Sequence, residues 1–322
     1  MADLLIVSGL TVELPTTAGW VKPVNQVSLR IAAGESLGLV GESGSGKTML
    51  SLAVMGLLPP GARVSGEIAL RNGQAETNNL TGLSEQQWRR VRGRQIAMIF
   101  QEPMTSLNSV MRIGAQIEEA ILAHEPKVER QELQRRLFTA MQHAAVLEAE
   151  TRAQQFPHQL SGGLRQRAMI AMALAPQPKL LIADEPTTAL DVTVQKQILD
   201  LLDRLRRELN LALLFITHDL GVVAKVADRV AVMYAGRIVE QGPAQKVLEA
   251  PQHPYTRGLL AASPRLERAA LTPIPGTVPR AAELPPGCAF APRCSYRRRE
   301  CDQAVPALRF REPDHGARCV LV

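Results

Sequence analysis

The chain has 322 residues, which is long enough for one large domain with an appendage. Its 46% hydrophobic and 21% charged residues are typical of a globular protein and exclude a mainly disordered one. With only 3% aromatic residues, a surface for stacking nucleic-acid bases is not expected. No long uncharged apolar run exists, and residues 1–7 lack a basic start, so neither a membrane span nor an ordinary secretory signal is expected.

The positive charge and the cysteines are concentrated at the C-terminal end. Of the net charge of +6, residues 262–322 carry +4, from ten arginines, no lysine and six acidic residues. The same segment holds all four cysteines, Cys288, Cys294, Cys301 and Cys319. Disulfides are improbable in a cytosolic protein, so this cysteine cluster in a Pro- and Arg-rich segment indicates a metal site.

The first half of the chain is expected to begin with β-structure. Short apolar stretches broken by Gly and Pro predict antiparallel strands, which lead into a fully buried strand at residues 36–40. After a glycine-rich loop, residues 48–58 have helical spacing that ends before Pro59. A further strand is expected at 96–100, and residues from 102 to about 175 predict a helical subdomain.

Strand and helix signals alternate in the second half. Strands predicted at 180–183 and 213–216 flank an amphipathic helix at 192–209, which implies a mainly parallel sheet covered by helices. A hairpin is expected over 230–240. The hydrophobic periodicity typical of helices and strands weakens beyond Pro251, where prolines become frequent. The predicted domains are therefore residues 1–250 and 251–322.

A glycine-rich loop with a phosphate-binding pattern lies between the buried strand and the first helix. Its sequence is Gly41-Glu42-Ser43-Gly44-Ser45-Gly46-Lys47-Thr48. The glycines let backbone N–H groups and the helix N-terminus face phosphate oxygens. Lys47 would reach the β- and γ-phosphates, and Thr48 would offer its hydroxyl to Mg²⁺. The alternatives, a ligand-free turn or a dinucleotide site, fit less well, because Lys-Thr stands where a dinucleotide loop needs small residues.

Two acidic residues follow the strand predicted at 180–183. The carboxyl ends of parallel strands face the ligand crevice, so Asp184 is expected to hold Mg²⁺ and Glu185 to polarise an attacking water. The alternative is that these acids only cap the next helix. Their occurrence after a phosphate-binding loop favours the catalytic interpretation.

A further motif lies between these two sites, Leu160-Ser161-Gly162-Gly163-Leu164-Arg165-Gln166-Arg167. With its helical continuation and the acidic pair that follows, it resembles the signature motif of ABC-transporter ATPases. Gln101, residues 188–191 and His218 fit the same family, so the resemblance covers nearly the whole chain. It implies an α/β P-loop NTPase fold, with a RecA-like core, an antiparallel β subdomain, a helical signature subdomain and the Cys-containing C-terminal extension.

The resemblance also implies roles for individual residues. Ser161, Gly162 and Gly163 would contact the γ-phosphate held by an opposite subunit, because Gly-Gly at a helix N-terminus offers N–H groups to an anion. The implied catalytic residues are Glu185, His218 and Gln101. The implied Mg²⁺ ligands are Thr48, Gln101 and Asp184. The implied ATP-binding residues are Gly41, Ser43, Gly44, Ser45, Gly46, Lys47, Thr48, Gln101, Asp184, Ser161, Gly162 and Gly163.

Three positions bear on how well the chain fits that family. Leu164 replaces the usual Gln of the signature, which removes a side-chain amide but no backbone donor, so activity is expected to survive. Thr188 replaces a Ser and keeps the hydroxyl. Trp20 is the candidate for the aromatic that stacks on adenine, because residues 21–40 contain none. The alternative is a surface or half-buried Trp.

The C-terminal residues narrow the resemblance to one branch of the ABC-transporter ATPases. Residues 250–260 resemble the His-Pro-Tyr-Thr segment of the peptide/nickel importer family, and residues 286–294 look like the C-terminal extension of dipeptide and oligopeptide permease ATPases. Residues 41–47 and 100–108 fit the same family. The resemblance therefore implies the D-type ATPase subunit of a dipeptide permease.

Such a subunit would work within a transporter. The implied partners are two transmembrane permease subunits, a second homologous ATPase (in a heterodimer, or a homodimer) and an extracytoplasmic substrate-binding protein. The chain would lie on the cytoplasmic face of the inner membrane as a peripheral protein. ATP would favour the closed dimer, and hydrolysis would reopen it.

The four cysteines are separated by five, six and seventeen residues, which differs from the paired C-x-x-C of common zinc modules. Four thiolates can hold an iron–sulfur cluster, and the permease resemblance implies a [4Fe–4S] cluster on Cys288, Cys294, Cys301 and Cys319. Zinc and unliganded thiols are the alternatives. The neighbouring arginines would offset the negative charge of such a site; they are Arg293, Arg297, Arg298 and Arg299.

Two other functions stay open at this point. The same scaffold could power import of nickel or another small solute, because the other subunits select the substrate. The alternative of a soluble ABC ATPase that acts on nucleic acid is supported by the basic residues Arg89, Arg90, Arg92 and Arg94. Such proteins usually carry two nucleotide domains or a long insertion, and a charge run is usually a solvated face, so no nucleic-acid partner is expected.

Overall fold

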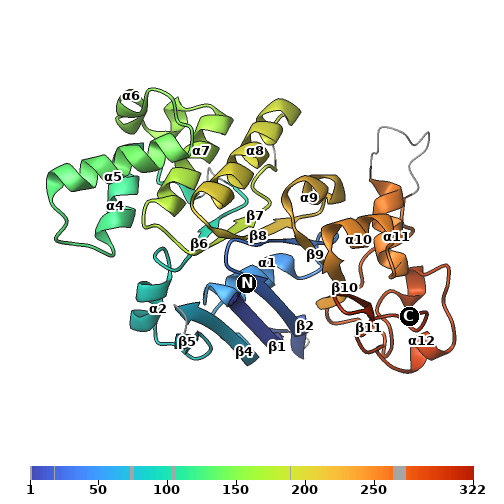
Figure 1. Ribbon diagram of the computed structural model, residues 1–322. Helices are drawn as coiled ribbons and strands as arrows, with labels where there is room; N and C mark the ends of the chain where they lie inside the picture. The colour runs from blue at the N-terminus through green and yellow to red at the C-terminus, as the bar shows by residue number, and fades with distance from the viewer. Residues whose placement is uncertain (1, 18, 73–75, 103–105, 189, 264–272) are drawn as a thin grey trace. The chain divides into compact units, whose positions relative to one another are not determined.

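The computed structural model describes residues 2–17, 19–72, 76–102, 106–188, 190–263 and 273–322 (Figure 1). The chain forms two compact units, one made of Met1–Gly82 and Leu214–Val322, the other of Leu83–Leu213. The division falls within β8 (Ala212–Thr217). Residues 103–105 and Ala189, which belong to two of the family motifs above, lie outside the described residues. The domain boundary near residue 251 stays a prediction.

The first unit is an α/β structure with two sheets. Its strands are β1 (Asp3–Thr16), β2 (Gly19–Ala32), β3 (Ser36–Val40), β4 (Arg63–Asn72), β5 (Glu76–Asn79), β9 (Arg229–Tyr234), β10 (Arg237–Pro243), β11 (Arg309–Glu312) and β12 (His315–Ala317). Its helices are α1 (Lys47–Val54), α9 (Leu220–Val226), α10 (Ala244–Glu249), α11 (Pro254–Ala262), the 3₁₀ helix η2 (Ala291–Arg293) and α12 (Glu300–Gln303).

The N-terminal sheet has the order β2-β1-β4-β5, with antiparallel neighbours. Its apolar residues are buried, as at Leu5, Val7 and Leu10 of β1. This confirms the antiparallel β-structure expected at the N-terminus.

The central strand β3 is buried at every position and lies parallel to β9. It lies between β9 and β8 in the order β11-β12-β10-β9-β3-β8. The predicted hairpin is formed by β9 and β10, and its two turn residues, Ala235 and Gly236, both have positive φ (45° and 82°). Such φ values are typical of the two-residue turn that matches the twist of antiparallel strands.

The first helix is shorter than its predicted span of 48–58, because α1 ends at Val54. Gly56 adopts a φ of 62° and donates its N–H to Ala53, while Leu57 donates to the carbonyl of Leu52. These two bonds form a Schellman motif, in which a left-handed glycine stops the helix. Apolar residues continue past Gly56, but the helical backbone conformation ends before it.

The C-terminal extension is folded in spite of its weak periodicity. β12 pairs with β10, and the buried carboxylate of Glu240 lies where they meet. This carboxylate accepts hydrogen bonds from the backbone N–H groups of Gln252 (2.7 Å) and His253 (2.9 Å), and it pairs with Nε2 of His315 (2.8 Å). Glu240 therefore connects three segments that are distant in sequence.

The Glu240→Gln variant is expected to unfold at a lower temperature, with a free energy of unfolding lowered by about 2–4 kcal/mol. The amide keeps the side-chain shape but replaces one acceptor oxygen by a donor, which would face a donor of Gln252, His253 or His315. Thermal and denaturant melts compare it with Glu283→Gln, a change at an exposed acid of the same extension. Equal melts for both variants would contradict this account.

The second unit is mainly helical around a parallel strand pair. Its strands β6 (Ile96–Ile99) and β7 (Leu180–Asp184) are buried and pair in parallel. Its helices are α2 (Glu85–Val91), α4 (Ile113–Leu122), α5 (Arg130–His143), α6 (Ala149–Ala153), the 3₁₀ helix η1 (Pro157–Gln159), α7 (Gly162–Leu174) and α8 (Val192–Glu208). Helices α4 to α7 confirm the helices expected between residues 102 and 175.

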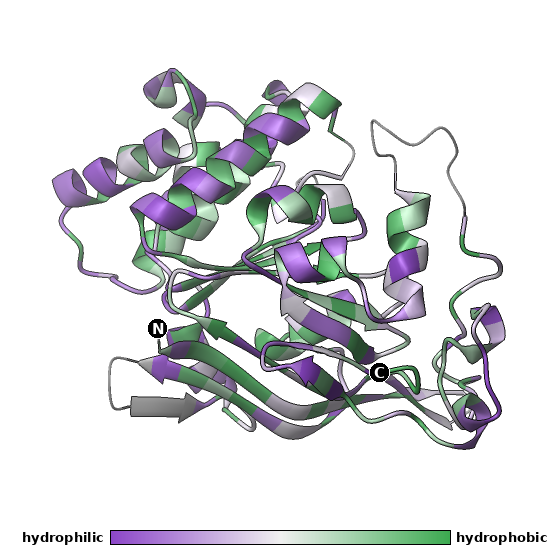
Figure 2. Cartoon of the chain, turned by 45° about the vertical axis from the view of Figure 1, so that its right-hand side comes forward, coloured by the Kyte–Doolittle hydropathy of each residue, from purple (hydrophilic) through white to green (hydrophobic). Residues whose placement is uncertain are grey.

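Hydrophilic and hydrophobic residues alternate along these helices (Figure 2). In α8 the buried residues are Ile198, Leu199, Leu201, Leu202 and Leu205. This spacing confirms the amphipathic helix expected at 192–209. Within the described ranges, no helix combines the length and the apolar character needed to cross a membrane.

Candidate functional site

The phosphate-binding loop connects β3 to α1 in the first unit. Gly46 is the N-cap of α1 with a φ of 104°, and Gly44 has a φ of 79°, so both adopt conformations that favour glycine. A Cβ on Gly41 would collide with the carbonyl of Met233, and one on Gly46 with the carbonyl of Pro23. Gly46 is therefore required for both space and backbone conformation, Gly41 for space, and Gly44 for backbone conformation.

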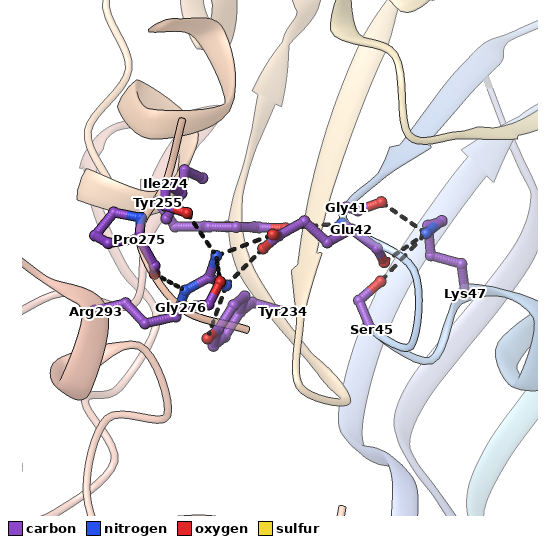
Figure 3. Close-up of polar contacts among 10 residues, drawn as sticks. All are labelled: Gly41, Glu42, Ser45, Lys47, Tyr234, Tyr255, Ile274, Pro275, Gly276 and Arg293. Atoms are coloured by element: carbon purple, nitrogen blue, oxygen red, sulfur yellow. Dashed lines mark hydrogen bonds and ion pairs between the residues drawn. The ribbon is translucent and has the colours of Figure 1, made fainter. Parts of the chain in front are cut away.

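The side chain of Lys47 stabilises this loop by hydrogen bonds to its carbonyl groups from the inner side. Its Nζ donates to the carbonyls of Gly41 (2.7 Å) and Glu42 (2.9 Å), and it lies 3.4 Å from Oγ of Ser45 (Figure 3). On the outer side, residues 43 and 44 and Thr48 are exposed. The arrangement leaves backbone N–H groups and the start of a helix open to an anion, next to a buried cation.

Glu42 is a loop residue whose contacts the sequence reasoning missed. Its N–H donates to the hydroxyl of Tyr255 (2.8 Å), and its carboxylate forms a two-bond ion pair with Arg293 (2.7 and 3.0 Å) (Figure 3). Both partners come from the region beyond residue 250. No local pattern could have revealed these contacts, since 213 and 251 residues separate the partners.

In the second unit, the acidic pair lies at the end of β7. Asp184 is the buried last residue of the strand, and Glu185 adopts a φ of 46°, which is unusual for a residue with a side chain. The carboxylate of Glu185 accepts hydrogen bonds from Gln101 Nε2 (3.3 Å) and Thr188 Oγ1 (3.0 Å). Three residues of separate family motifs are thus brought together around one carboxylate oxygen.

The signature residues form the N-terminus of α7. Ser161 is the N-cap, and its side chain accepts a hydrogen bond from the N–H of Leu164 (3.4 Å). A Cβ on Gly163 would lie 2.9 Å from Cγ1 of Val194, which is too close. Leu164 donates its backbone N–H to Ser161 in this turn, and that donor does not depend on the side chain. That activity survives with leucine at this position stays a prediction.

The remaining predicted residues have the following positions. Asp191 is the N-cap of α8 and accepts from the N–H of Val194 (2.9 Å), which gives it a structural role at the start of this helix. His218 follows β8 and is exposed. Trp20 is 43% exposed, and the guanidinium of Arg63 lies 3.9 Å from the centre of its ring. A cation therefore already covers one face of the proposed adenine-stacking ring.

The cysteines converge in the C-terminal extension. Cys288, Cys294, Cys301 and Cys319 all line one pocket, together with His253 and apolar residues. All four are free thiols. Burial raises the pKa of Cys288, Cys294 and Cys319 above the ordinary value of a thiol. In the part of the chain that is described, no group of His, Cys, Asp or Glu is arranged to hold a single metal ion.

Comparison with known proteins matches two families to this chain. Residues 24–188 match the ABC transporter family, and residues 239–301 match the C-terminal region of oligopeptide/dipeptide transporters. The dipeptide transport ATP-binding protein DppD of Bacillus subtilis is 46% identical, over 100% of this chain and 95% of its own length. The oligopeptide transport ATP-binding protein OppD of Salmonella typhimurium is 50% identical, over 95% and 90%.

Solved structures agree with this assignment. A dimeric post-hydrolysis structure of the ATP-binding cassette MJ0796 with ADP and Pi matches with a TM-score of 0.65 and 26% identity, over 75% of this chain and 99% of that one. The match confirms the predicted ABC ATPase fold. The chain therefore belongs to the ABC transporter family, as an ATP-binding subunit that carries the C-terminal region of the oligopeptide/dipeptide transporters.

Proposed function

We propose that the chain hydrolyses ATP to power the import of dipeptides and oligopeptides across a membrane. The observation that carries this proposal is the combination, in one chain, of a formed phosphate-binding loop and the C-terminal region of peptide transporters. Relatives named for dipeptide and oligopeptide transport support the substrate class. The chain would work at the cytoplasmic face of the inner membrane as a peripheral subunit.

The proposed roles of the individual residues in ATP hydrolysis are as follows. Lys47 and the N–H groups of the loop would bind the phosphates, and Thr48, Asp184 and Gln101 are the residues that would hold Mg²⁺. Glu185 accepts a proton from the attacking water, because it is the carboxylate that Gln101 and Thr188 orient. His218 contacts the γ-phosphate. Ser161, Gly162 and Gly163 offer the N-terminus of α7 to the γ-phosphate held by a second ATPase subunit.

The proposed cycle of closing and opening depends on the second ATPase subunit. ATP binds the closed pair better than the open pair, so binding shifts the population towards closure, and hydrolysis removes the γ-phosphate that holds it closed. Two membrane permease subunits would convert this closure into exposure of the substrate site, and an extracytoplasmic binding protein would deliver the peptide.

We propose that the cysteine pocket holds an iron–sulfur cluster rather than zinc. A single zinc ion requires four ligand atoms at about 2.3 Å from one centre. The described residues contain no group placed for a single ion, although four thiols share one pocket. A cluster of several irons is larger than one ion, so its cysteines stand farther apart. A [4Fe–4S] cluster held by Cys288, Cys294, Cys301 and Cys319 would link their segments and stabilise the extension.

Anaerobic purification of the full chain is expected to give about four iron and four sulfide per protein. Cys301→Ser is expected to lose most of this iron, because it removes one of the four thiolates, whereas Ser295→Ala at a neighbouring exposed position keeps it. Colorimetric iron and sulfide analysis measures both. Less than about one iron per chain in the wild type, or stoichiometric zinc, would contradict the cluster.

The substrate class is tested with the reconstituted transporter. ATPase activity of the complex with its permeases and binding protein is expected to rise when dipeptides or oligopeptides are added. Stimulation by nickel salts without any response to peptides would support the small-solute alternative and refute peptide import.

A further inference from the structure

Glu42 stands out in the phosphate-binding loop because each of its polar groups is bonded. Its N–H donates to Tyr255, and its carbonyl accepts from Lys47 Nζ (2.9 Å) and from the N–H of Ser45 (3.2 Å). Its carboxylate is held by Arg293 (Figure 3). The loop is therefore fixed at this residue from two sides, by Lys47 inside it and by the C-terminal extension outside it.

The side chain of Arg293 is fixed within the C-terminal extension, in a position where it binds this carboxylate. Its side chain is 5% exposed, and that of Glu42 is 30% exposed. Nε donates to the carbonyl of Pro275 (2.7 Å), and NH2 donates to that of Gly276 (3.2 Å). These bonds leave the guanidinium little freedom, and they aim its remaining donors at Glu42. Bidentate pairs of this kind are strong and specific in geometry.

Tyr255 provides the second contact, and it too is held in place. The side chain is fully buried and packs against Tyr234 and Phe290, with ring centres 4.6 and 5.4 Å away. Its N–H donates to Nδ1 of His253 (3.0 Å), which fixes the start of α11. The hydroxyl of Tyr255 is thus a rigid acceptor for the N–H of Glu42.

The charge of Glu42 makes these contacts matter for ATP. A carboxylate in the phosphate-binding loop repels a triphosphate unless a cation neutralises it. Arg293 supplies that cation, and Arg293 with Tyr255 holds the loop in shape before the nucleotide arrives. A loop that is ordered in advance loses less conformational entropy on binding.

We propose that Arg293 and Tyr255 are positioning residues for the phosphate-binding loop, through which the C-terminal extension sets the affinity for ATP. This rests on the proposed binding of ATP at the loop. Arg293 also directly precedes Cys294 at the end of η2, so the element that lines the cysteine pocket is the one that holds Glu42.

The Arg293→Ala variant is expected to raise the KM for ATP about tenfold and to change kcat less than about twofold, because it leaves the Glu42 charge unpaired beside the phosphates. The double variant Glu42→Ala/Arg293→Ala is expected to recover most of this loss, since the repelling charge is then gone. Arg280→Ala, at an exposed arginine of the same extension, is the matched control and keeps the wild-type KM. ATPase kinetics and the Kd of a fluorescent ATP analogue give both values for the full chain.

The recovery shows that Arg293 acts by neutralising Glu42 and separates this role from a general loss of structure, because a damaged fold would not be repaired by Glu42→Ala. Tyr255→Phe keeps the ring packing and removes one hydroxyl, and it is expected to raise the KM about threefold even if Arg293→Ala does not fold. A double variant as weak as Arg293→Ala, or a Tyr255→Phe variant with unchanged KM, would overturn the proposal. A wild-type chain that binds no ATP would instead refute the proposed function.

Discussion

The Glu185→Gln variant is expected to lower the ATP turnover number about 100-fold or more while it leaves ATP binding nearly unchanged. The amide oxygen keeps the place of the carboxylate between Gln101 and Thr188, but it cannot take a proton from the attacking water. ATP then stays intact, so the closed pair of subunits accumulates. Phosphate release measures the turnover, and size-exclusion chromatography with ATP measures the pairing.

Glu119→Gln is the matched control for that change, because Glu119 is an exposed acid on α4 of the same unit. It is expected to retain wild-type turnover. A Glu185→Gln variant that hydrolyses ATP within threefold of the wild-type rate would refute the catalytic role of Glu185.

The second large effect is expected for Lys47→Ala, which should weaken ATP binding about 100-fold or more. The change removes the cation that faces the phosphates, and it also removes the bonds that close the loop onto the carbonyls of Gly41 and Glu42. Isothermal titration with ATP and Mg²⁺ measures the affinity.

Lys22→Ala serves as the control for the lost positive charge, because Lys22 is a half-exposed lysine paired with Glu13 elsewhere in the first unit. Its Kd is expected to match the wild type. If Lys47→Ala bound ATP with a Kd within threefold of the wild type, the loop would not be the nucleotide site.

The sequence could predict the elements whose signals are local. The strand at 36–40, the loop after it and the acids at the end of β7 were all expected, because each is a short pattern with its own chemistry. The end of the first helix was placed too late, although Gly56 was a visible stop signal. In that case backbone conformation, and not hydrophobicity, decided where the helix ends.

The C-terminal extension could not be predicted in the same way. Its strands have three and four residues, and α12 has four, which is too short for a periodic pattern. Its order depends on distant partners, such as Glu240 with His315 and Glu42 with Arg293. Irregular cysteine spacing likewise could not reveal that the four thiols line one pocket.

The central claim, that ATP hydrolysis by this chain powers peptide import, is tested most directly by uptake of a radiolabelled dipeptide into proteoliposomes. The complete transporter is reconstituted with ATP and Mg²⁺ on the side of the ATPase subunits and with the binding protein on the other. Uptake is expected for the wild-type chain and only at background level for Glu185→Gln. Equal dipeptide uptake by both, or none by a wild-type complex that hydrolyses ATP, would contradict the claim.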